Sequence, residues 1–199
     1  MENVGFVEKA KGFLLKPTET FSKVKEETLG EVLKYFVIWI VIYGILLTIV
    51  MTVAGGTMGS IYGNIPGFSG VTGASMGLTC TLGLFFVILI GGIIGLFIGA
   101  GIVHLGVLLV GGKNGYSQTV KAVGYGYTPQ FILGWIPFIN IIAGIWALVI
   151  EIIGVRELQE VSTGRAIIAV LLPVMIIVGI TVAIAATIYV YVSGMLPAS

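Results

Sequence analysis

Few side chains in this sequence could do chemistry, and three of them lie near the ends of long apolar stretches. Glu151 is the one carboxylate inside a predicted membrane span, five residues before Arg156. His104 and Tyr125 lie at a similar depth, and Gln130 follows in the same stretch as Tyr125. Ionisable groups inside a membrane are costly and face the protein interior, where they mark proton or ion sites. These four residues therefore form a candidate intramembrane polar site.

A simpler interpretation of Glu151 remains open. Its side chain has the length to reach the membrane surface and pair there with Arg156, Lys113 or Lys121. In that case the carboxylate stabilises the helix bundle and binds nothing.

The sequence offers no catalytic constellation. Gly73-Ala74-Ser75-Met76-Gly77 matches the G-x-S-x-G pattern, but a serine nucleophile needs a base within about 3 Å. His104 is too far along the chain from Ser75, and the sequence contains no Asp. Gly111-Gly112-Lys113 lacks the Ser or Thr of a phosphate loop. With one His and one Cys we expect no metal site, no cofactor and no enzymatic activity.

The composition requires a membrane. Hydrophobic residues make up 57% of the 199 positions and charged residues 10%, against about 25% charged in soluble proteins. So few charges cannot cover a water-soluble globule or form a nucleic-acid-binding surface. The apolar stretches are long and unbroken, which excludes an outer-membrane barrel. The sequence predicts an all-α, polytopic helical membrane protein.

Five stretches are candidates for transmembrane spans, because a span needs about 20 apolar residues. They cover about residues 35–54, 79–110, 122–134, 138–155 and 166–192. The third and fourth are short, so they predict either two slanted crossings or one re-entrant hairpin. The turn between them contains Trp135, Pro137 and Phe138, which are typical of a membrane interface and favour two crossings.

The charges orient this five-span map. All ten cations fall on one side of it, which predicts a cytoplasmic N-terminus and a C-terminus outside. A hairpin in place of spans three and four gives the same orientation. We expect Arg156 and Arg165 to anchor their helix ends at the cytoplasmic surface. The cations are Lys9, Lys11, Lys16, Lys23, Lys25, Lys34, Lys113, Lys121, Arg156 and Arg165.

Residues 1–34 form a predicted cytoplasmic amphipathic segment before the membrane domain of residues 35–199. Val7, Ala10 and Leu14 recur at helical spacing, and Pro17 then interrupts the pattern. One interpretation is one or two helices lying in the membrane interface. The other is a solvated lead-in that packs on the loops.

Two glycine and proline patterns predict local packing. Gly91, Gly95 and Gly99 form a double G-x-x-x-G, which favours close helix packing inside the molecule and leaves a dimer face as the alternative. Pro129 breaks the third span, because it cannot donate a hydrogen bond and clashes with the carbonyl of Tyr125. We expect Thr128 or Gln130 to bond the freed carbonyl.

Four elements along the chain carry a family resemblance. They are Lys16-Pro17-Thr18-Glu19-Thr20-Phe21, the loop Gly111-Gly112-Lys113-Asn114-Gly115-Tyr116-Ser117-Gln118-Thr119, the pair Gly124-Tyr125 with Pro129, and the series Trp146, Leu158, Ser162 and Arg165-Ala166. In this order they resemble the Yip family of five-span membrane proteins, named for their interaction with Ypt/Rab GTPases.

The resemblance implies a non-enzymatic, membrane-organising scaffold or adaptor of the trafficking type. It implies homo- or hetero-oligomers formed through membrane helices, a cytoplasmic protein partner that is GTPase-like by analogy, and no nucleic acid. The short N-terminal segment looks like that of a prokaryotic member, located in the cell membrane. The alternative from the residues themselves is a small transporter or channel built around Glu151, His104 and Tyr125.

Overall fold

The computed structural model describes residues 5–62 and 78–195, and within these ranges the regular structure is entirely helical. The described ranges contain eight helices: α1 (Phe6–Leu15), α2 (Pro17–Val24), α3 (Leu29–Tyr62), α4 (Leu78–Leu109), α5 (Gly115–Gly126), α6 (Thr128–Leu133), α7 (Ile139–Gln159) and α8 (Thr163–Met195). Ser75 and its glycine-flanked motif lie outside the described residues, as does most of the predicted first loop. Helix α3 continues to Tyr62, beyond the predicted end of the first span.

Four of these helices are long and apolar enough to cross a membrane. The qualifying ranges are Leu29–Thr52, Leu82–Leu109, Ile139–Gln159 and Thr163–Tyr189. The protein is therefore an integral membrane protein of helical type. The predicted third span is divided between α5 and α6 and is not among the four, so a count of five crossings stays a prediction.

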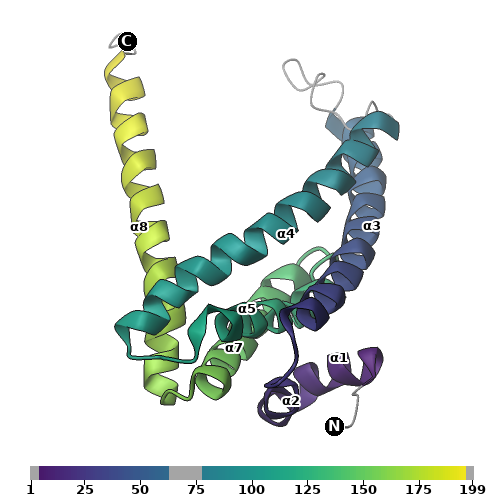
Figure 1. Ribbon diagram of the computed structural model, residues 1–199. Helices are drawn as coiled ribbons and strands as arrows, with labels where there is room; N and C mark the ends of the chain where they lie inside the picture. Colours follow the sequence, from purple (N-terminus) through teal and green to yellow (C-terminus); the bar gives the residue numbers. More distant parts are fainter. Residues whose placement is uncertain (1–4, 63–77, 196–199) are drawn as a thin grey trace.

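Helix α4 slants across the molecule and contacts a different long helix toward each of its ends (Figure 1). It packs on α3 at the end far from the N-terminus and on α8 near the opposite end. At the second crossing the bare backbone of Gly106 lies directly on the backbone of Ala169, with no room for a Cβ atom. From this crossing α4 and α8 diverge, so the outer part of α8 is exposed on all sides.

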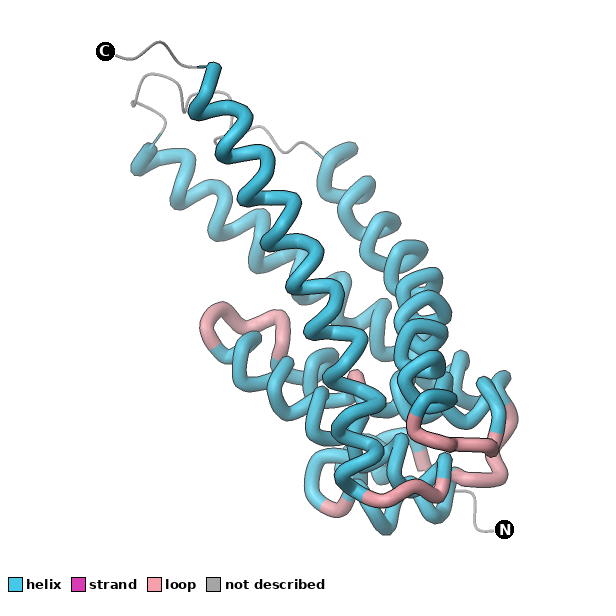
Figure 2. Tube along the Cα trace, turned by 90° about the vertical axis from the view of Figure 1, so that its left-hand side faces the viewer, coloured by secondary structure: helices cyan, strands magenta, loops and turns pink. Residues whose placement is uncertain are grey.

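Helices α5, α6 and α7 form a hairpin, and its first arm is broken by Pro129. Helix α5 ends at Gly126 and α6 begins at Thr128. The Thr128 hydroxyl donates to the Tyr125 carbonyl (2.6 Å), which is one of the two bonds expected from the sequence. The turn at residues 134–138, drawn in pink, ends well short of the outer ends of α3, α4 and α8 (Figure 2).

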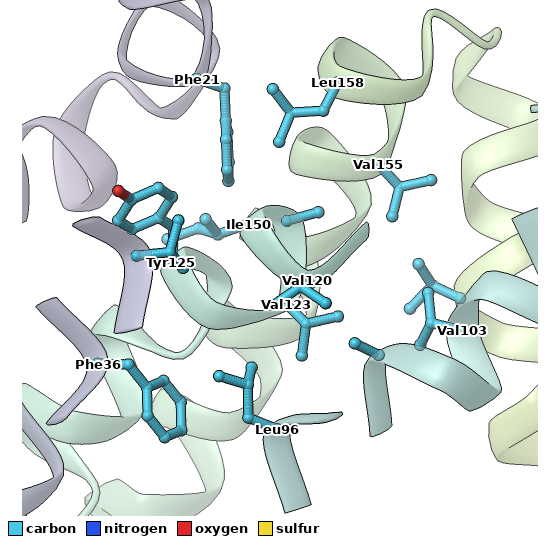
Figure 3. Close-up of a cluster of buried hydrophobic side chains, with 14 of the residues drawn as sticks. Phe21, Phe36, Leu96, Val103, Val120, Val123, Tyr125, Ile150, Val155 and Leu158 are labelled. Atoms are coloured by element: carbon cyan, nitrogen blue, oxygen red, sulfur yellow. The ribbon is translucent and has the colours of Figure 1, made fainter. Parts of the chain in front are cut away.

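The first two helices belong to the core. Phe13 of α1 and Phe21 of α2 are fully buried, and α2 packs on α7. Figure 3 shows Phe21 and Leu158 facing the same apolar interior as Tyr125 and Ile150 of the hairpin. The N-terminal segment is thus neither extended nor detached: α1 and α2, here called the N-terminal helices, cover the base of the hairpin.

Candidate functional site

The base of the hairpin holds a cluster of polar groups that joins it to the N-terminal helices. Lys9 of α1 pairs with Glu27, which follows α2, at 2.6 Å (Nζ to Oε1). The hydroxyl of Tyr125 on α5 donates to the other carboxylate oxygen of Glu27. Both charged side chains are mostly buried, and Lys9 is only 8% exposed. We call Lys9, Glu27 and Tyr125 the Glu27 cluster.

A second buried cation lies beside this cluster. Lys121 on α5 is 4% exposed, and its amine donates to the carbonyl of Lys25 just after α2 (2.6 Å). A cation suits this position, because the last carbonyls of a helix carry partial negative charge. Burial lowers the pKa of the Lys121 amine, and the carboxylates of Glu26 and Glu27 oppose that effect.

Aromatic rings from α1 and α3 pack around Tyr125 of the Glu27 cluster. The ring of Phe13 stacks on Tyr125 with centroids 4.8 Å apart, and Tyr35 of α3 meets Tyr125 edge-on at 5.1 Å. Phe6 stacks on Trp39 at 5.3 Å. Rings in these arrangements exclude water and favour a fixed geometry, which keeps the local dielectric low and the buried ion pair strong.

One hydrogen bond sets the depth of the hairpin relative to α3. The hydroxyls of Tyr35 on α3 and Thr128 on α6 lie 2.9 Å apart, and Thr128 is fully buried. Tyr35 follows directly after the exposed Lys34. The start of α6 is therefore level with the charged first turns of α3.

His104 belongs to a different polar group from Tyr125. Its Nδ1 lies 2.8 Å from the Thr119 hydroxyl, which also accepts from Gln159 Nε2 at 3.0 Å. Gln159 Oε1 in turn accepts the backbone N–H of Asn114 (3.0 Å), and Asn114 Nδ2 donates to the Leu158 carbonyl (2.9 Å). These contacts bind the loop at residues 111–114 to the end of α7.

This loop is the one that carries the family resemblance, and its glycines have specific roles. Gly111 and Gly115 adopt positive φ angles of 86° and 79°, which other residues rarely tolerate. Gly112 lies against Val107 and Gln159. Lys113 is exposed. The loop was recognised from the sequence, but Gln159, which holds it, carried no signal of its own.

Glu151 does not join the other candidate residues through any bond. Among the described residues its carboxylate makes no hydrogen bond or ion pair, and its side chain is half-buried. Arg156 instead pairs with Glu157 (2.6 Å) and donates to Thr18 (3.0 Å). The backbone of Glu151 packs directly on Gly126, where an added Cβ would lie 3.1 Å from the Glu151 Cα.

Gln130 lies at the junction of the hairpin with α3 and α4. It lines a half-open cavity of about 320 Å³ together with Phe36, Tyr43, Gly95 and other side chains of these helices. Its side-chain oxygen is buried without a hydrogen-bond partner in the described structure. Gln130 thus lies apart from the bonded groups of both His104 and Tyr125.

The glycines of the double G-x-x-x-G make no close helix contact within the described residues. Gly91, Gly95 and Gly99 have open space where a Cβ would project, with no described atom within 4 Å. The close helix contacts are made by other glycines, such as Gly106 and Gly126. Arg165 is exposed near the start of α8.

The polar groups of this helix bundle therefore connect its helices and loops to one another. The Glu27 cluster joins the N-terminal helices to α5, and Gln159 joins the loop at residues 111–114 to α7. No group of three or more His, Cys, Asp or Glu side chains in the described part of the chain is arranged to hold a metal ion.

A comparison of the sequence with models of protein families identifies the family of this chain. The model of the Yip1 domain matches residues 11–185, which include the second half of α1, all of α2, the hairpin and most of α8. The chain belongs to the Yip1 family. No curated protein matches it, and no solved structure does.

The Yip1 match agrees with the resemblance inferred from the four sequence elements, and it begins within α1. In this Yip1 protein some residues of each element lie at tertiary contacts. Phe21 and Gly124 are buried at helix crossings, and Pro129 marks the break between α5 and α6. The buried residues of the family pattern thus hold the bundle together, whereas Lys113, Ser162 and Arg165 are exposed.

Proposed function

We propose that this Yip1 protein is a non-enzymatic membrane scaffold or adaptor that presents its N-terminal helices to a protein partner in the cytoplasm. The observation that carries the proposal is the rigid attachment of α1 and α2 to the hairpin by the Glu27 cluster. Helices held in this way offer a preformed surface, which lowers the entropic cost of binding.

The outward side of the N-terminal helices has the character of a protein-binding surface. A groove of about 280 Å³ runs between α1 and α2, and Leu15 at its edge is 79% exposed. Basic and acidic side chains alternate around it, which suits a partner segment of mixed charge. The charged lining residues are Glu8, Lys11, Lys16, Glu19 and Lys23.

Photo-crosslinking tests this proposal in native membranes. A benzoylphenylalanine at position 15 should give a discrete protein adduct, and one at Val87 on the lipid-exposed side of α4 should not. Lys11→Glu combined with Lys23→Glu should remove the adduct, while Lys34→Glu on α3 should leave it unchanged. Val87 and Lys34 are both exposed and lie outside the groove, so they are matched controls.

Two outcomes would reject the proposal. One is the absence of any protein adduct at position 15 from correctly folded protein. The other is an ion flux into liposomes that contain the purified protein, if the Glu151→Gln substitution abolishes this flux. Such a flux would favour the transporter. The location in the cell membrane of a prokaryote is part of the same proposal, and fractionation of native membranes tests it.

A further inference from the structure

The hairpin of α5, α6 and α7 differs from the other apolar helices in how far it extends from the N-terminal side. Helices α3, α4 and α8 each have 32 residues or more. The two arms of the hairpin have 18 residues (12 in α5 and 6 in α6) and 21 residues. Its turn ends part-way along the long helices (Figure 2).

Charged and hydrogen-bonded residues fix the depth of the first arm. Lys34 is exposed, and we expect its charge to lie in the headgroup region, since an unpaired charge in hydrocarbon is costly. Tyr35, the next residue, bonds to Thr128 at the start of α6. Helical side chains lean toward their N-terminus, so Thr128 lies no deeper than the Tyr35 backbone. The six residues of α6 then add only about 9 Å, at ~1.5 Å per residue.

The length of the second arm, α7, gives a depth for the turn that agrees with the depth from the first arm. The backbone of Glu151 packs on Gly126, next to Tyr125 of the Glu27 cluster. From Ile139 to Glu151 the helix axis covers at most about 18 Å, at ~1.5 Å per residue. The hydrocarbon core is about 30 Å thick. Although α7 is long and apolar enough to span, its last two turns are level with the charged base of the hairpin.

The end of the hairpin has a surface suited to lipid. Phe138 at the turn is 89% exposed, and the first half of α7 exposes Ile141, Ile142 and Ile145. Two polar side chains of this segment donate to backbone carbonyls within it: Asn140 to Gly134 at 2.7 Å and Trp135 to Ile132 at 2.9 Å. Exposed apolar side chains with satisfied backbone and amide groups are what a hydrocarbon environment requires.

We propose that residues 115–159 form a re-entrant hairpin that enters the membrane from the N-terminal side, turns near the middle of the bilayer and binds acyl chains of that leaflet. The membrane is then crossed fully by α3, α4 and α8. The surface formed by Phe138, Ile141, Ile142 and Ile145 contacts the ends of the lipid tails.

Site-directed labelling tests the depth of the turn. In a Cys80→Ser background, a cysteine at position 138 is treated in sealed vesicles, in turn from each side, with a membrane-impermeant maleimide. We expect no labelling from either side. Lys113→Cys should react from the N-terminal side and Ser199→Cys from the other. Reaction of Phe138→Cys from either side would overturn the re-entrant arrangement.

A nitroxide at the same cysteine gives an independent measure. For a turn inside the bilayer, collisions with dissolved oxygen exceed collisions with a water-soluble nickel chelate, and for a turn at the far interface the nickel chelate dominates. Ile141→Cys, three residues further and also exposed, serves if Phe138→Cys does not fold. Dominance of the nickel chelate at position 138, or at position 141 if that variant is used, would overturn the proposal.

Discussion

The ring of Phe21 lies directly against the bare backbone of Gly154. A Cβ atom at Gly154 would be 2.6 Å from the Phe21 Cζ and 3.1 Å from the Ala122 Cα. This contact joins α2 to the hairpin where α5 and α7 pack on each other. It makes the segment before α3 part of the same packed interior as the apolar helices.

Gly154→Ala is therefore expected to destabilise the protein. Overpacking a tight contact costs about 1–3 kcal/mol, and the backbone of α5 leaves Phe21 little room to move. Gly101→Ala on α4 is the control, because both positions are helical and Gly101 has open space around it. Thermal unfolding in detergent should show a lower midpoint for Gly154→Ala alone. Equal midpoints would mean that Phe21 does not pack on α7.

The Glu27 cluster predicts a strong effect from removing one charge. Lys9→Met leaves a buried carboxylate without its cation, which costs about 3–5 kcal/mol. Glu27→Gln in the same chain should recover part of this loss, so the double variant costs less than the sum. Chemical denaturation measures all three variants.

Lys16→Met provides the contrast for the buried pair. Lys16 pairs with Glu19 at 3.6 Å, but both side chains are more than 60% exposed. An exposed pair of this kind contributes about 0–1 kcal/mol. A similar loss for Lys9→Met and Lys16→Met would show that Lys9 is not buried in solution.

The bond between Tyr35 and Thr128 predicts a difference between two conservative variants. Thr128→Val leaves the Tyr35 hydroxyl and the Tyr125 carbonyl without this partner, at a cost of about 1–3 kcal/mol for a buried group. Thr128→Ser keeps the hydroxyl and should stay close to wild type. The unfolding midpoint should therefore rank wild type and Ser above Val, and the reverse order would exclude the bond.

The pair of Lys25 and Glu160 predicts a pH dependence that Glu160→Gln removes. The hydrogen bond with Lys25 lowers the pKa of Glu160 from its ordinary 4.5, so this stabilisation is lost as pH falls below that value. The same bond raises the pKa of Lys25 above 10.5, so stabilisation is lost as pH rises beyond it. Between these limits the contribution is constant.

Unfolding midpoints from pH 3 to pH 11 measure this effect. Because both side chains are solvent-exposed at the protein surface, we expect a small change at each limit. Because each pKa shift is caused by the other partner, Glu160→Gln and Lys25→Met should each flatten the profile at both ends. A profile identical to that of the wild type in both variants would contradict the pairing.

The long helices could be predicted from the sequence because lipid selects for apolar length. Helices α4 and α8 begin and end within a few residues of the expected limits. The break at Pro129 was also predictable, since it follows from the covalent structure of proline. These features depend on local composition alone.

Tertiary contacts could not be predicted in the same way. The helical spacing grouped Val7 with Ala10 on one apolar face, whereas the structure buries Ala10 and exposes Val7. It also buries Phe13 and Lys9, which were not part of that pattern. A buried lysine is expected only when its carboxylate partner is known, and Glu27 follows 18 residues later. Tyr125 was recognised as a buried polar residue, but its bond to Glu27 spans 98 residues and left no periodic signal.

The bond between Glu27 and Tyr125 also sets an order of events during synthesis. Lys9 and Glu27 emerge from the ribosome close together, whereas Tyr125 follows only after all of α3 and α4 has been made. The N-terminal helices, which are translated first, can therefore dock only after the hairpin has been made. Contacts between such distant residues form late, because the entropy of closing the intervening chain must first be overcome. The earliest part of the chain is among the last to reach its final place.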